Sequence, residues 1–443
     1  MKKKVDFLIV YETRVRELEN VCLLKYELER RGYSVAIINT WNSIVNTKKN
    51  VKYDAKVVIT PSMYNDGIYD FMKSIVGNMK KIVNLQWEQI GTIGDEKRQD
   101  SRFVLKGMAS QCMNICWGDV TVNRLLNKSG FDKKHIRKTG QIALDFCSKR
   151  MRNYYEKREQ LFEKYNINLN YEVNLFISSF SYVNLPEYVL NQSQISDKSD
   201  FIKISIKSFD SIIDWFQKML TNYPNQAIIY RPHPAEATNK KLLRMEKMFG
   251  DRFKVISERS VKQWIIVVDR VYTWYSTSAA EAYMCDVPCA ILRPVEIPEI
   301  LELQLYEDAK FIKNFDEFIG TLHNVIQPSL SETVFNKCYD VKETLSYIRV
   351  ADVVEETLKN PEYLIHDKRK KLKKSLFLVC KEKLYFLISW TAENVFKNIK
   401  SLEHFRNAKN IDDYTYERCK NNYADEETIK IIQEKIKCVL ERK

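Results

Sequence analysis

The sequence predicts an α/β protein of two doubly wound, Rossmann-like domains followed by a basic helical extension. Short apolar runs of strand length alternate with longer amphipathic segments of helix length, which is typical of βαβ units around a parallel sheet. The alternation restarts after a polar stretch at Arg150–Tyr165, which we expect to be a helical bridge. The chain has 443 residues, which is enough for two or three domains.

The first predicted domain, residues 1–165, contains six apolar runs that we expect to be strands. Between the first two runs, Val15–Arg31 has apolar residues near helical spacing and is followed by Gly32, which is typical of a helix end. The expected strands are Val5–Val10, Ser34–Ile38, Lys56–Thr60, Lys81–Gln86, Met113–Trp117 and Ile136–Thr139.

The second predicted domain, residues 166–360, repeats the pattern. Its expected helices are Ile202–Leu220, Asn239–Met248 and Ser276–Met284. Its expected strands are Asn174–Ser178, Ala227–Tyr230, Phe253–Ile256, Ile265–Thr273 and Cys289–Leu292. Ligands of open α/β sheets bind beyond the carboxyl ends of the strands, so polar residues that follow these runs are candidates for a site.

The third predicted region, residues 361–443, is a basic amphipathic tail. The whole chain has a net charge of +13, and residues 361–400 contain ten Lys or Arg against four Asp or Glu. Apolar residues between Leu376 and Ile399 recur near helical spacing, as in helices that lie in a membrane interface. We expect docking on an anionic membrane surface, although a solvated helical face would give the same pattern. The docking residues would be Lys368, Arg369, Lys370, Lys371, Lys373 and Lys374.

No apolar run approaches the roughly 20 residues that span a bilayer, and the first residues do not form a signal-peptide core. The ten cysteines lack the paired spacing of a zinc site. We therefore expect a cytoplasmic protein with reduced thiols and no metal site, peripheral at the inner face of the plasma membrane. No nucleic-acid-binding motif accompanies the basic charge, so a nucleic-acid-binding protein is the weaker, non-enzyme alternative.

The most informative motif is Arg231-Pro-His-Pro234, at the end of the apolar run Ala227–Tyr230. Arginine offers a fork of donors to phosphate oxygens. The two prolines fix φ on both sides of His233 and exclude a helix. A histidine held in this way can donate to a phosphate and stabilise a leaving nucleotide.

A second motif, Ser276-Thr-Ser278, also follows an apolar run and precedes an expected helix. Hydroxyl side chains at a helix start cap its amides, and the same groups can bind a phosphate. We therefore assign Arg231, His233, Ser276, Thr277 and Ser278 to a nucleotide-phosphate site. Glu281, in the first turn, either complements the helix dipole or reaches ribose hydroxyls.

With these motifs the chain resembles bacterial glycosyltransferases of surface-carbohydrate and capsule biosynthesis that have the GT-B fold, in particular sialyl- and Kdo-transferase-like enzymes. His233-Pro234 matches their histidine–proline motif, and Ser276-Thr277 matches their Ser-Ser/Thr motif. Arg16-Glu-Leu18 and Lys138-Thr-Gly-Gln-Ile-Ala-Leu-Asp145 are similar to elements of their first domain. The resemblance covers about residues 5–330.

The resemblance implies transfer of a sugar from a nucleotide-activated donor, with a CMP-sugar favoured and a UDP-sugar possible as donor. The acceptor would be a surface polysaccharide or a lipid-linked glycan. No cofactor or metal would be required. His233, Ser276 and Thr277 would contact the donor nucleotide, with Arg231 nearby.

The acceptor hydroxyl needs a general base, which we expect in the first domain. With its proton taken by this base, the acceptor oxygen would attack the sugar by direct displacement. Family members often have an acidic pair followed by glycine there, and this sequence departs from that pattern. Three carboxylates after predicted strands are candidates: Glu88, Asp66 and Glu12. Each is also compatible with an ordinary loop or cap residue.

Two other enzyme classes remain open. A CDP-glycerol or polyol-phosphate transferase of the teichoic-acid type resembles this chain in fold, histidine–proline element and cytidine donor. A non-hydrolysing UDP-sugar epimerase has the same fold and would act without an acceptor. Donor trials with CDP-glycerol, CMP-sugars and UDP-sugars separate these alternatives.

Overall fold

The computed structural model describes residues 3–40, 53–183, 198–236, 239–324, 326, 329–369 and 421–441. Contacts divide the chain into two compact units. The first unit comprises Met1–Trp87, Leu105–Ile115 and Val350–Glu434, and the second comprises Glu88–Val104, Cys116–Arg349 and Lys435–Lys443.

The first sheet has six strands in the order β2-β1-β3-β4-β5-β6. The register of β1, with Phe7 beside both Val35 and Val57, places this strand between β2 and β3. Residues 7–11 of β1 are almost fully buried, as expected of a strand covered on both faces. The strands are β1 (Lys3–Tyr11), β2 (Val35–Asn39), β3 (Tyr53–Thr60), β4 (Ile82–Asn84), β5 (Met113–Cys116) and β6 (Ile136–Lys138).

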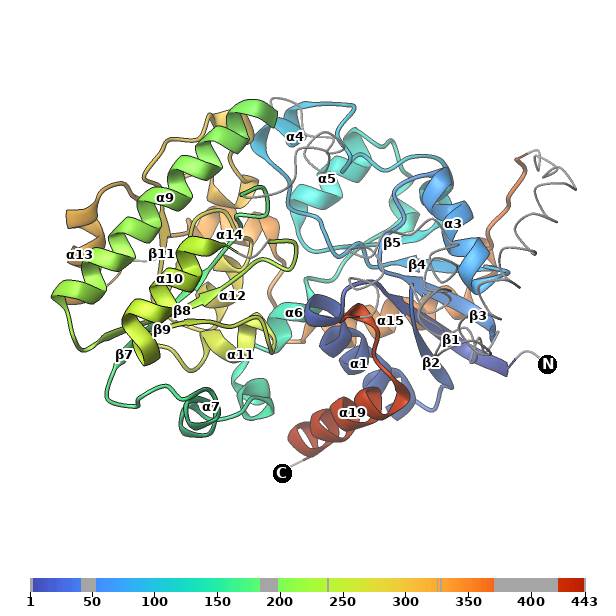
Figure 1. The fold of residues 1–443 in the computed structure, drawn as a ribbon. Coiled ribbons are helices and arrows are strands. Elements are labelled where there is room, and N and C mark those ends of the chain that lie inside the picture. Colours follow the sequence, from blue (N-terminus) through green and yellow to red (C-terminus); the bar gives the residue numbers. More distant parts are fainter. Residues whose placement is uncertain are drawn as a thin grey trace, which may run out of the picture. The chain divides into compact units, whose positions relative to one another are not determined.

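The first unit has both early helices and late ones (Figure 1). They are α1 (Arg14–Arg30), α3 (Asp66–Val76), η2 (Gly107–Gln111), most of α15 (Ser346–Lys359), η8 (Pro361–Tyr363) and the first part of α19 (Glu426–Leu440). The predicted domain limits at 165 and 360 therefore do not coincide with the observed units.

The end of α15 is attached to the first unit by a buried lysine. The Lys81 ammonium donates to the carbonyl oxygens of Thr357 at 2.9 Å, Leu358 at 2.7 Å and Asn360 at 2.7 Å. These carbonyls end a helix and lack partners within it, so a cation there satisfies them and complements the helix dipole. No local feature of the sequence indicates this long-range contact.

The second sheet has the strand order β12-β11-β10-β7-β8-β9. All its pairs are parallel. This is the order of dinucleotide-binding domains, in which the chain builds one half of the sheet and then returns to build the other. The strands are β7 (Glu172–Ile177), β8 (Gln226–Arg231), β9 (Phe253–Val255), β10 (Arg270–Thr273), β11 (Cys289–Leu292) and β12 (Phe311–Ile312).

Helices surround the second sheet (Figure 1), and the longest is α9 (Lys198–Asn222). Its Phe216 packs edge to face on Phe176 of β7, with ring centroids 5.2 Å apart. The remaining helices of the second unit are α4 (Ile93–Lys97), α5 (Asp119–Asn127), η3 (Lys133–His135), α6 (Ile142–Asp145), η4 (Lys149–Tyr154), α7 (Arg158–Tyr165), α10 (Lys240–Phe249), η5 (Gly250–Arg252), α11 (Val261–Ile265), α12 (Ala279–Met284), η6 (Glu299–Leu301), η7 (Gln304–Tyr306), α13 (Phe315–His323) and α14 (Glu332–Cys338).

One expected strand was wrong over half of its length. The run Ile265–Thr273 begins at the end of α11, and only Arg270–Thr273 forms β10. Trp264 and Ile265 are fully buried. Residues 266–269, between α11 and β10, form a turn. The periodicity of a short apolar run does not separate a buried strand from other buried segments.

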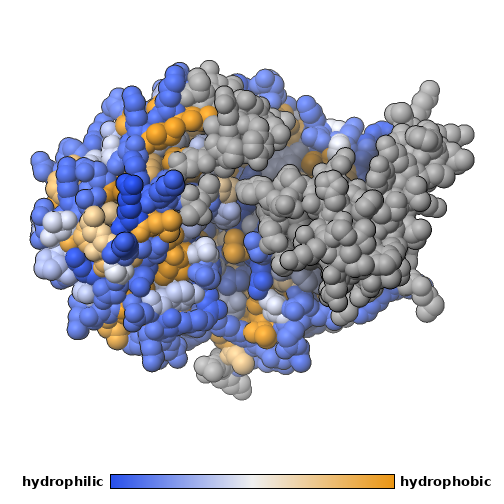
Figure 2. All heavy atoms as spheres, in the orientation of Figure 1, coloured by the Kyte–Doolittle hydropathy of each residue, from blue (hydrophilic) through white to orange (hydrophobic). Residues whose placement is uncertain are grey.

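On the face drawn in Figure 2, hydrophilic residues cover most of the described surface and apolar residues form small patches. Within the described ranges, no helix combines the length and the apolar character needed to cross a bilayer. Of the predicted docking residues, Lys370, Lys371, Lys373 and Lys374 lie outside the described residues, as does the amphipathic stretch from Leu376 to Ile399.

Candidate functional site

The second sheet has its topological switch point between β7 and β10, where the chain returns past its first strand. Ligands of open α/β sheets bind beyond the carboxyl ends of the strands at such a point. Here β7 is followed by Ser178 and Ser179, and β10 by Trp274, Tyr275 and Ser276. The motif at Arg231-Pro-His233 follows β8, the neighbour of β7 on its other side.

Ser178 and Ser179 contact residues next to both predicted motifs. Neither serine was among the predicted site residues. The Ser179 hydroxyl accepts from the Tyr275 N–H at 3.1 Å, on the β10 side. The Ser178 hydroxyl donates to Glu236 at 2.6 Å, on the β8 side. Their position at the end of the central strand was the only sequence signal that could have identified them.

Glu236 holds the His233 loop. Its Oε2 accepts from the His233 N–H at 3.0 Å as well as from Ser178. Its Oε1 lies 2.6 Å from the hydroxyl of Tyr230, which is fully buried. Burial raises the pKa of Glu236, while these hydrogen bonds oppose the shift. The carboxylate therefore fixes the start of the loop against the sheet.

The same loop sets the tautomer of His233. The Ala235 N–H donates to His233 Nδ1 at 3.1 Å. In a neutral imidazole, a ring nitrogen that accepts leaves the proton on the other nitrogen. His233, which is partly exposed, therefore has Nε2 as its donor, which is the arrangement needed to donate to a phosphate.

The contacts of Arg231 give it a structural role in addition to the predicted one. Its guanidinium donates from Nη1 to the Glu258 carbonyl at 2.8 Å, and from Nη2 to the Arg259 carbonyl. Only 8% of Arg231 is exposed. Arg259 has φ of 68°, in the left-handed region that is unfavourable for a non-glycine residue. Arg231 thus supports the loop after β9, and its contact with a phosphate stays a prediction.

The Ser276-Thr-Ser278 segment forms a turn whose backbone is hydrogen-bonded to the Tyr306 side chain. Ser276 Oγ accepts from the Ser278 N–H at 3.2 Å. The Tyr306 hydroxyl accepts from the Ser276 N–H at 3.1 Å and donates to its carbonyl at 2.8 Å. Thr277 is exposed.

The expected cap of the following helix is wrong in detail. Ser278 is at the N-cap position of α12 without a capping side-chain hydrogen bond, and α12 has only six residues. The Ser276 hydroxyl contacts the backbone of its own turn instead. Glu281 lies in the first turn of α12, and burial raises the pKa of its carboxyl. The nucleotide contacts of Ser276, Thr277, Ser278 and Glu281 stay predictions.

The first sheet has its switch point between β1 and β3. Glu12 and Thr13 follow β1 directly, so Glu12 is the predicted carboxylate that lies at this point. Its N–H donates to Glu17 Oε2 at 2.7 Å. Glu17 is 3% exposed, and burial raises its pKa to about 8. The sequence analysis matched Glu17 to a family element but gave it no role.

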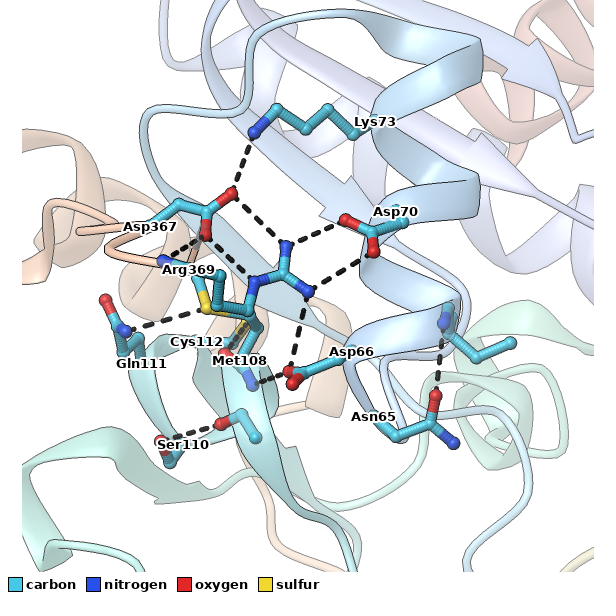
Figure 3. A network of polar contacts seen from close by, with 12 residues as sticks. Asn65, Asp66, Asp70, Lys73, Met108, Ser110, Gln111, Cys112, Asp367 and Arg369 are labelled. Carbon is cyan, nitrogen blue, oxygen red and sulfur yellow. Dashed lines mark hydrogen bonds and ion pairs between the residues drawn. The ribbon is translucent and has the colours of Figure 1, made fainter. Parts of the chain in front are cut away.

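Asp66 follows β3 as the first residue of α3, and it is part of a network of polar contacts (Figure 3). Its Oδ1 accepts from the Met108 N–H at 2.7 Å. Gly107 has φ of 62°, and a Cβ there would lie 2.2 Å from Asp66 Oδ1. The carboxylate is thus packed against the backbone of η2, which gives Asp66 a structural role, and its catalytic role stays a prediction.

Arg369, one of the predicted docking residues, lies in the same network (Figure 3). Its guanidinium contacts Asp70 at 2.7 Å, Asp367 at 2.9 Å and Asp66 at 3.9 Å. These hydrogen bonds and Lys73 lower the pKa of Asp367. For Arg369 to contact lipid phosphates, its guanidinium would have to leave these carboxylates. Lys368, beside it, is exposed.

Glu88, the third predicted base, belongs to the second unit by its contacts. Its carboxylate is 3.9 Å from the Arg102 guanidinium, and 41% of its side chain is exposed. The preceding Gln86 is buried and has φ of 44°, which is a strained backbone at the end of β4. The structure therefore does not bring Glu88, Asp66 and Glu12 together as one cluster in one unit.

Asp145 ends the segment Lys138–Asp145, which resembles an element of the glycosyltransferase family, and its carboxylate contacts the start of α15. Its two carboxylate oxygens accept from the N–H groups of Ser346 at 2.9 Å and Tyr347 at 2.7 Å, which satisfies the start of α15. Burial raises its pKa to about 7. A cavity of about 240 Å³ beside it is also lined by Gln141, Met284 and Lys342, and neither His233 nor Ser276 lines it.

Among the residues that the structure describes, no group of three or more His, Cys, Asp or Glu side chains could hold a metal ion.

No family model matches the sequence, and no curated protein matches it. Solved structures are similar in fold. A histidine-to-asparagine variant of the wall teichoic acid polymerase TagF gives a TM-score of 0.52 at 11% identity, over 81% of this chain and 89% of that chain. The same type of variant with CDPG gives 0.50 at 10% identity, over 80% and 89%. The Methanocaldococcus jannaschii UDP-GlcNAc 2-epimerase with UDP-GlcNAc and UDP gives 0.46 at 14% identity, over 79% and 99%.

These similarities, at low identity, concern the fold. Together with the two six-stranded parallel sheets, the likeness to TagF defines an α/β protein of the GT-B fold. The predicted fold class is confirmed.

Proposed function

We propose that the chain is a transferase that moves a sugar from a nucleotide-activated donor to an acceptor in bacterial surface-carbohydrate synthesis. One observation carries the proposal: His233, whose Nδ1 accepts from the Ala235 N–H, lies on a loop fixed by Glu236 beside the switch point of the second sheet. The structural neighbours of the chain support this class. They are a teichoic acid polymerase and UDP-GlcNAc 2-epimerases.

On the donor side, His233 would donate to the phosphate oxygen that becomes charged as the nucleotide leaves. A preorganised donor aimed at developing charge lowers the barrier, because it need not reorient during the reaction. Ser178, Ser179 and the turn at Ser276 would form the rest of the phosphate site. A CMP-sugar is the favoured donor, and no metal or cofactor is proposed.

On the acceptor side, Glu12 is the carboxylate that the topology favours, because it follows β1 at the switch point of the first sheet. It would take the proton from the acceptor hydroxyl as that oxygen attacks the anomeric carbon of the donor. Asp66 and Glu88 stay candidates for this role. Asp66 is packed against Met108 N–H, and Glu88 is paired with Arg102.

A nucleotide screen tests the donor site first. A ligand that binds only the folded protein raises its melting temperature with concentration, so CMP, CDP, UDP and GDP should separate in a thermal-shift series. We expect a cytidine nucleotide to give the largest shift. The His233→Ala variant should keep its fold and lose about 10²- to 10³-fold in kcat, as when an oxyanion donor is removed. Wild-type turnover in His233→Ala would refute the assignment.

A polyol-phosphate transferase is the second candidate, because the fold resemblance to TagF is stronger than that to the epimerases. Turnover of CDP-glycerol, with no turnover of CMP- or UDP-sugars, would establish it. Conversion of UDP-GlcNAc without any acceptor would instead establish an epimerase.

We also propose that the basic tail docks on an anionic membrane where a lipid-linked acceptor is held. Residues 421–434 belong to the first unit, so truncation at Pro361 would also disturb the fold. Replacement of Lys368, Lys370, Lys371, Lys373 and Lys374 by glutamine is the cleaner test. At about 1 kcal/mol per lysine near an anionic surface, this variant should lose most of its binding to phosphatidylglycerol vesicles. Undiminished binding would refute docking by these residues.

A further inference from the structure

The segment 421–425 lies against the switch-point loop of the first sheet. Asn422 Oδ1 accepts from the Arg14 N–H at 3.0 Å, although more than 400 residues separate the two in sequence. Arg14 begins α1, and Figure 1 shows the red C-terminal segment beside the start of this dark blue helix. The C-terminal segment therefore contacts the loop that contains Glu12.

A buried asparagine joins the segment and the loop a second time. Asn39, at the end of β2, donates from Nδ2 to the Glu12 carbonyl at 3.2 Å and to the Asn422 carbonyl at 3.2 Å. Asn39 is 2% exposed. Buried polar groups of this kind are costly to leave without partners, so departure of the segment would disturb Asn39 and, through it, Glu12.

The third contact is at β1 itself. The Ala424 N–H donates to the hydroxyl of Tyr11 at 2.9 Å, and both residues are buried. Beyond the segment, α19 attaches to α1 through Gln433, whose amide donates to the Cys22 carbonyl. The segment is thus anchored at both of its sides, to the strand before Glu12 and to the helix after it.

Glu12 is therefore held from two directions. From inside, Glu17 accepts from its N–H at 2.7 Å. From outside, Asn39 donates to its carbonyl and shares its amide with Asn422. Both peptide groups of the residue at the switch point are fixed, and one of them is fixed jointly with the C-terminal segment.

We propose that residues 421–425 form a strap that positions Glu12 for the acceptor side of the reaction. The inference rests on the proposed function, because it gives the strap a role in the same transfer. It assigns to Asn422, Asn39 and Tyr11 the part of positioning residues, which act through Glu12 and do not touch the reacting atoms.

The test compares full-length variants. Tyr11→Phe removes the acceptor of the Ala424 N–H, and Asn422→Ala removes that of the Arg14 N–H. Asn422→Asp keeps an oxygen acceptor for Arg14 and serves as the conservative variant. Tyr272→Phe is the matched control, because it removes another buried tyrosine hydroxyl, 2.6 Å from Thr321 Oγ1 in the second sheet.

Three measurements apply to each variant: amide hydrogen exchange of the peptide at 10–18, the thermal shift with the nucleotide found in the screen, and kcat and donor KM. For Tyr11→Phe and Asn422→Ala we expect faster exchange at 10–18 and a kcat lower by about 10- to 100-fold, as for a displaced reacting group. The thermal shift and the donor KM should stay at wild-type values. Asn422→Asp should recover most of kcat, and Tyr272→Phe should change neither exchange at 10–18 nor kcat.

Two outcomes would overturn the strap: unchanged exchange at 10–18 in both variants, or faster exchange with wild-type kcat. Failure of the proposed function looks different. In that case the wild-type protein itself shows no nucleotide-dependent thermal shift and no turnover, whereas hydrogen exchange still reports whether the strap holds the loop.

Discussion

The hydrogen bonds of Glu236 lead to a prediction about positioning of His233. In Glu236→Ala, the Ser178 hydroxyl, the Tyr230 hydroxyl and the His233 N–H lose the carboxylate that they contact at 2.6, 2.6 and 3.0 Å. Each buried donor without a partner costs about 1–3 kcal/mol, and the Tyr230 hydroxyl keeps the Ser178 hydroxyl as a second partner at 2.9 Å. Because Glu236 is partly exposed, water compensates in part, and we expect the free energy of unfolding to fall by about 2–4 kcal/mol.

The effect on turnover should exceed the effect on nucleotide binding. Pro232 and Pro234 still stiffen the loop, but its attachment to the sheet is lost, so His233 should shift. A displacement of about 1 Å at a reacting group lowers kcat by up to about 10²-fold. Urea unfolding measures stability, and steady-state turnover with the donor from the nucleotide screen measures kcat.

Two variants serve as controls. Glu236→Gln keeps an oxygen for Ser178 and the His233 N–H, and its amide can donate to Tyr230, so kcat should stay within a few-fold of wild type. Tyr230→Phe removes one of the three contacts and should cost about 1 kcal/mol in stability without a large loss of kcat. Wild-type kcat in Glu236→Ala, with the loss of stability present, would refute the view that this carboxylate positions His233.

Two further predictions concern stability of the first unit. Burial raises the pKa of Glu17 from 4.5 to about 8 in the folded state. Its contribution to stability is therefore complete below pH 4.5 and is lost as the pH rises through 8, at about 1.4 kcal/mol per pH unit. Glu17→Gln should flatten the fall of the free energy of unfolding between pH 5 and pH 8, measured by urea titration; an unchanged slope would contradict the burial. Gly107→Ala should destabilise more than Gly130→Ala in thermal unfolding, by about 1–3 kcal/mol for the added clash. Both glycines have φ near 63°, at 62° and 64°, but only at Gly107 would the Cβ meet Asp66, so equal losses would contradict the packing.

The sequence predicted most strands and helices because their signals are local. Apolar runs such as Lys56–Thr60 were long enough to cross a sheet, and glycine or proline ended the elements between them. The local signal failed at Ile265, which ends a short helix, and at residues 266–269, which form a turn before β10. It also gave no indication that α15 and the segment 421–434 would join the first unit, because those contacts link residues hundreds of positions apart.

The candidate site could be predicted where its residues form a motif, as at Arg231–Pro234. The site could not be predicted where residues that follow different strands meet, because the sequence does not show the order of the strands. Glu236 lies two residues after this motif, but its partner Ser178 follows another strand, and only the pairing of β7 with β8 brings them together. The motif gave no sign of one structural contact, and the phosphate contact of Arg231 stays a prediction. Arg231 contains the donors that phosphate binding requires, yet it uses them on the carbonyls of Glu258 and Arg259.

The strand order also changes which of the three candidates for the general base is favoured. The sequence alone offered Glu88, Asp66 and Glu12 as candidates for the base, each after a predicted strand. The order β2-β1-β3 puts the switch point next to β1, where Glu12 is the first residue after the strand. Asp66 and Glu88 each have a contact that accounts for their carboxylates, with Met108 N–H and Arg102. The backbone of Glu12 is held on both sides, by Glu17 and Asn39. Fixed peptide groups give a residue a defined position, which is the first demand on a base, before a suitable pKa. The role of Glu12 as the base stays a proposal.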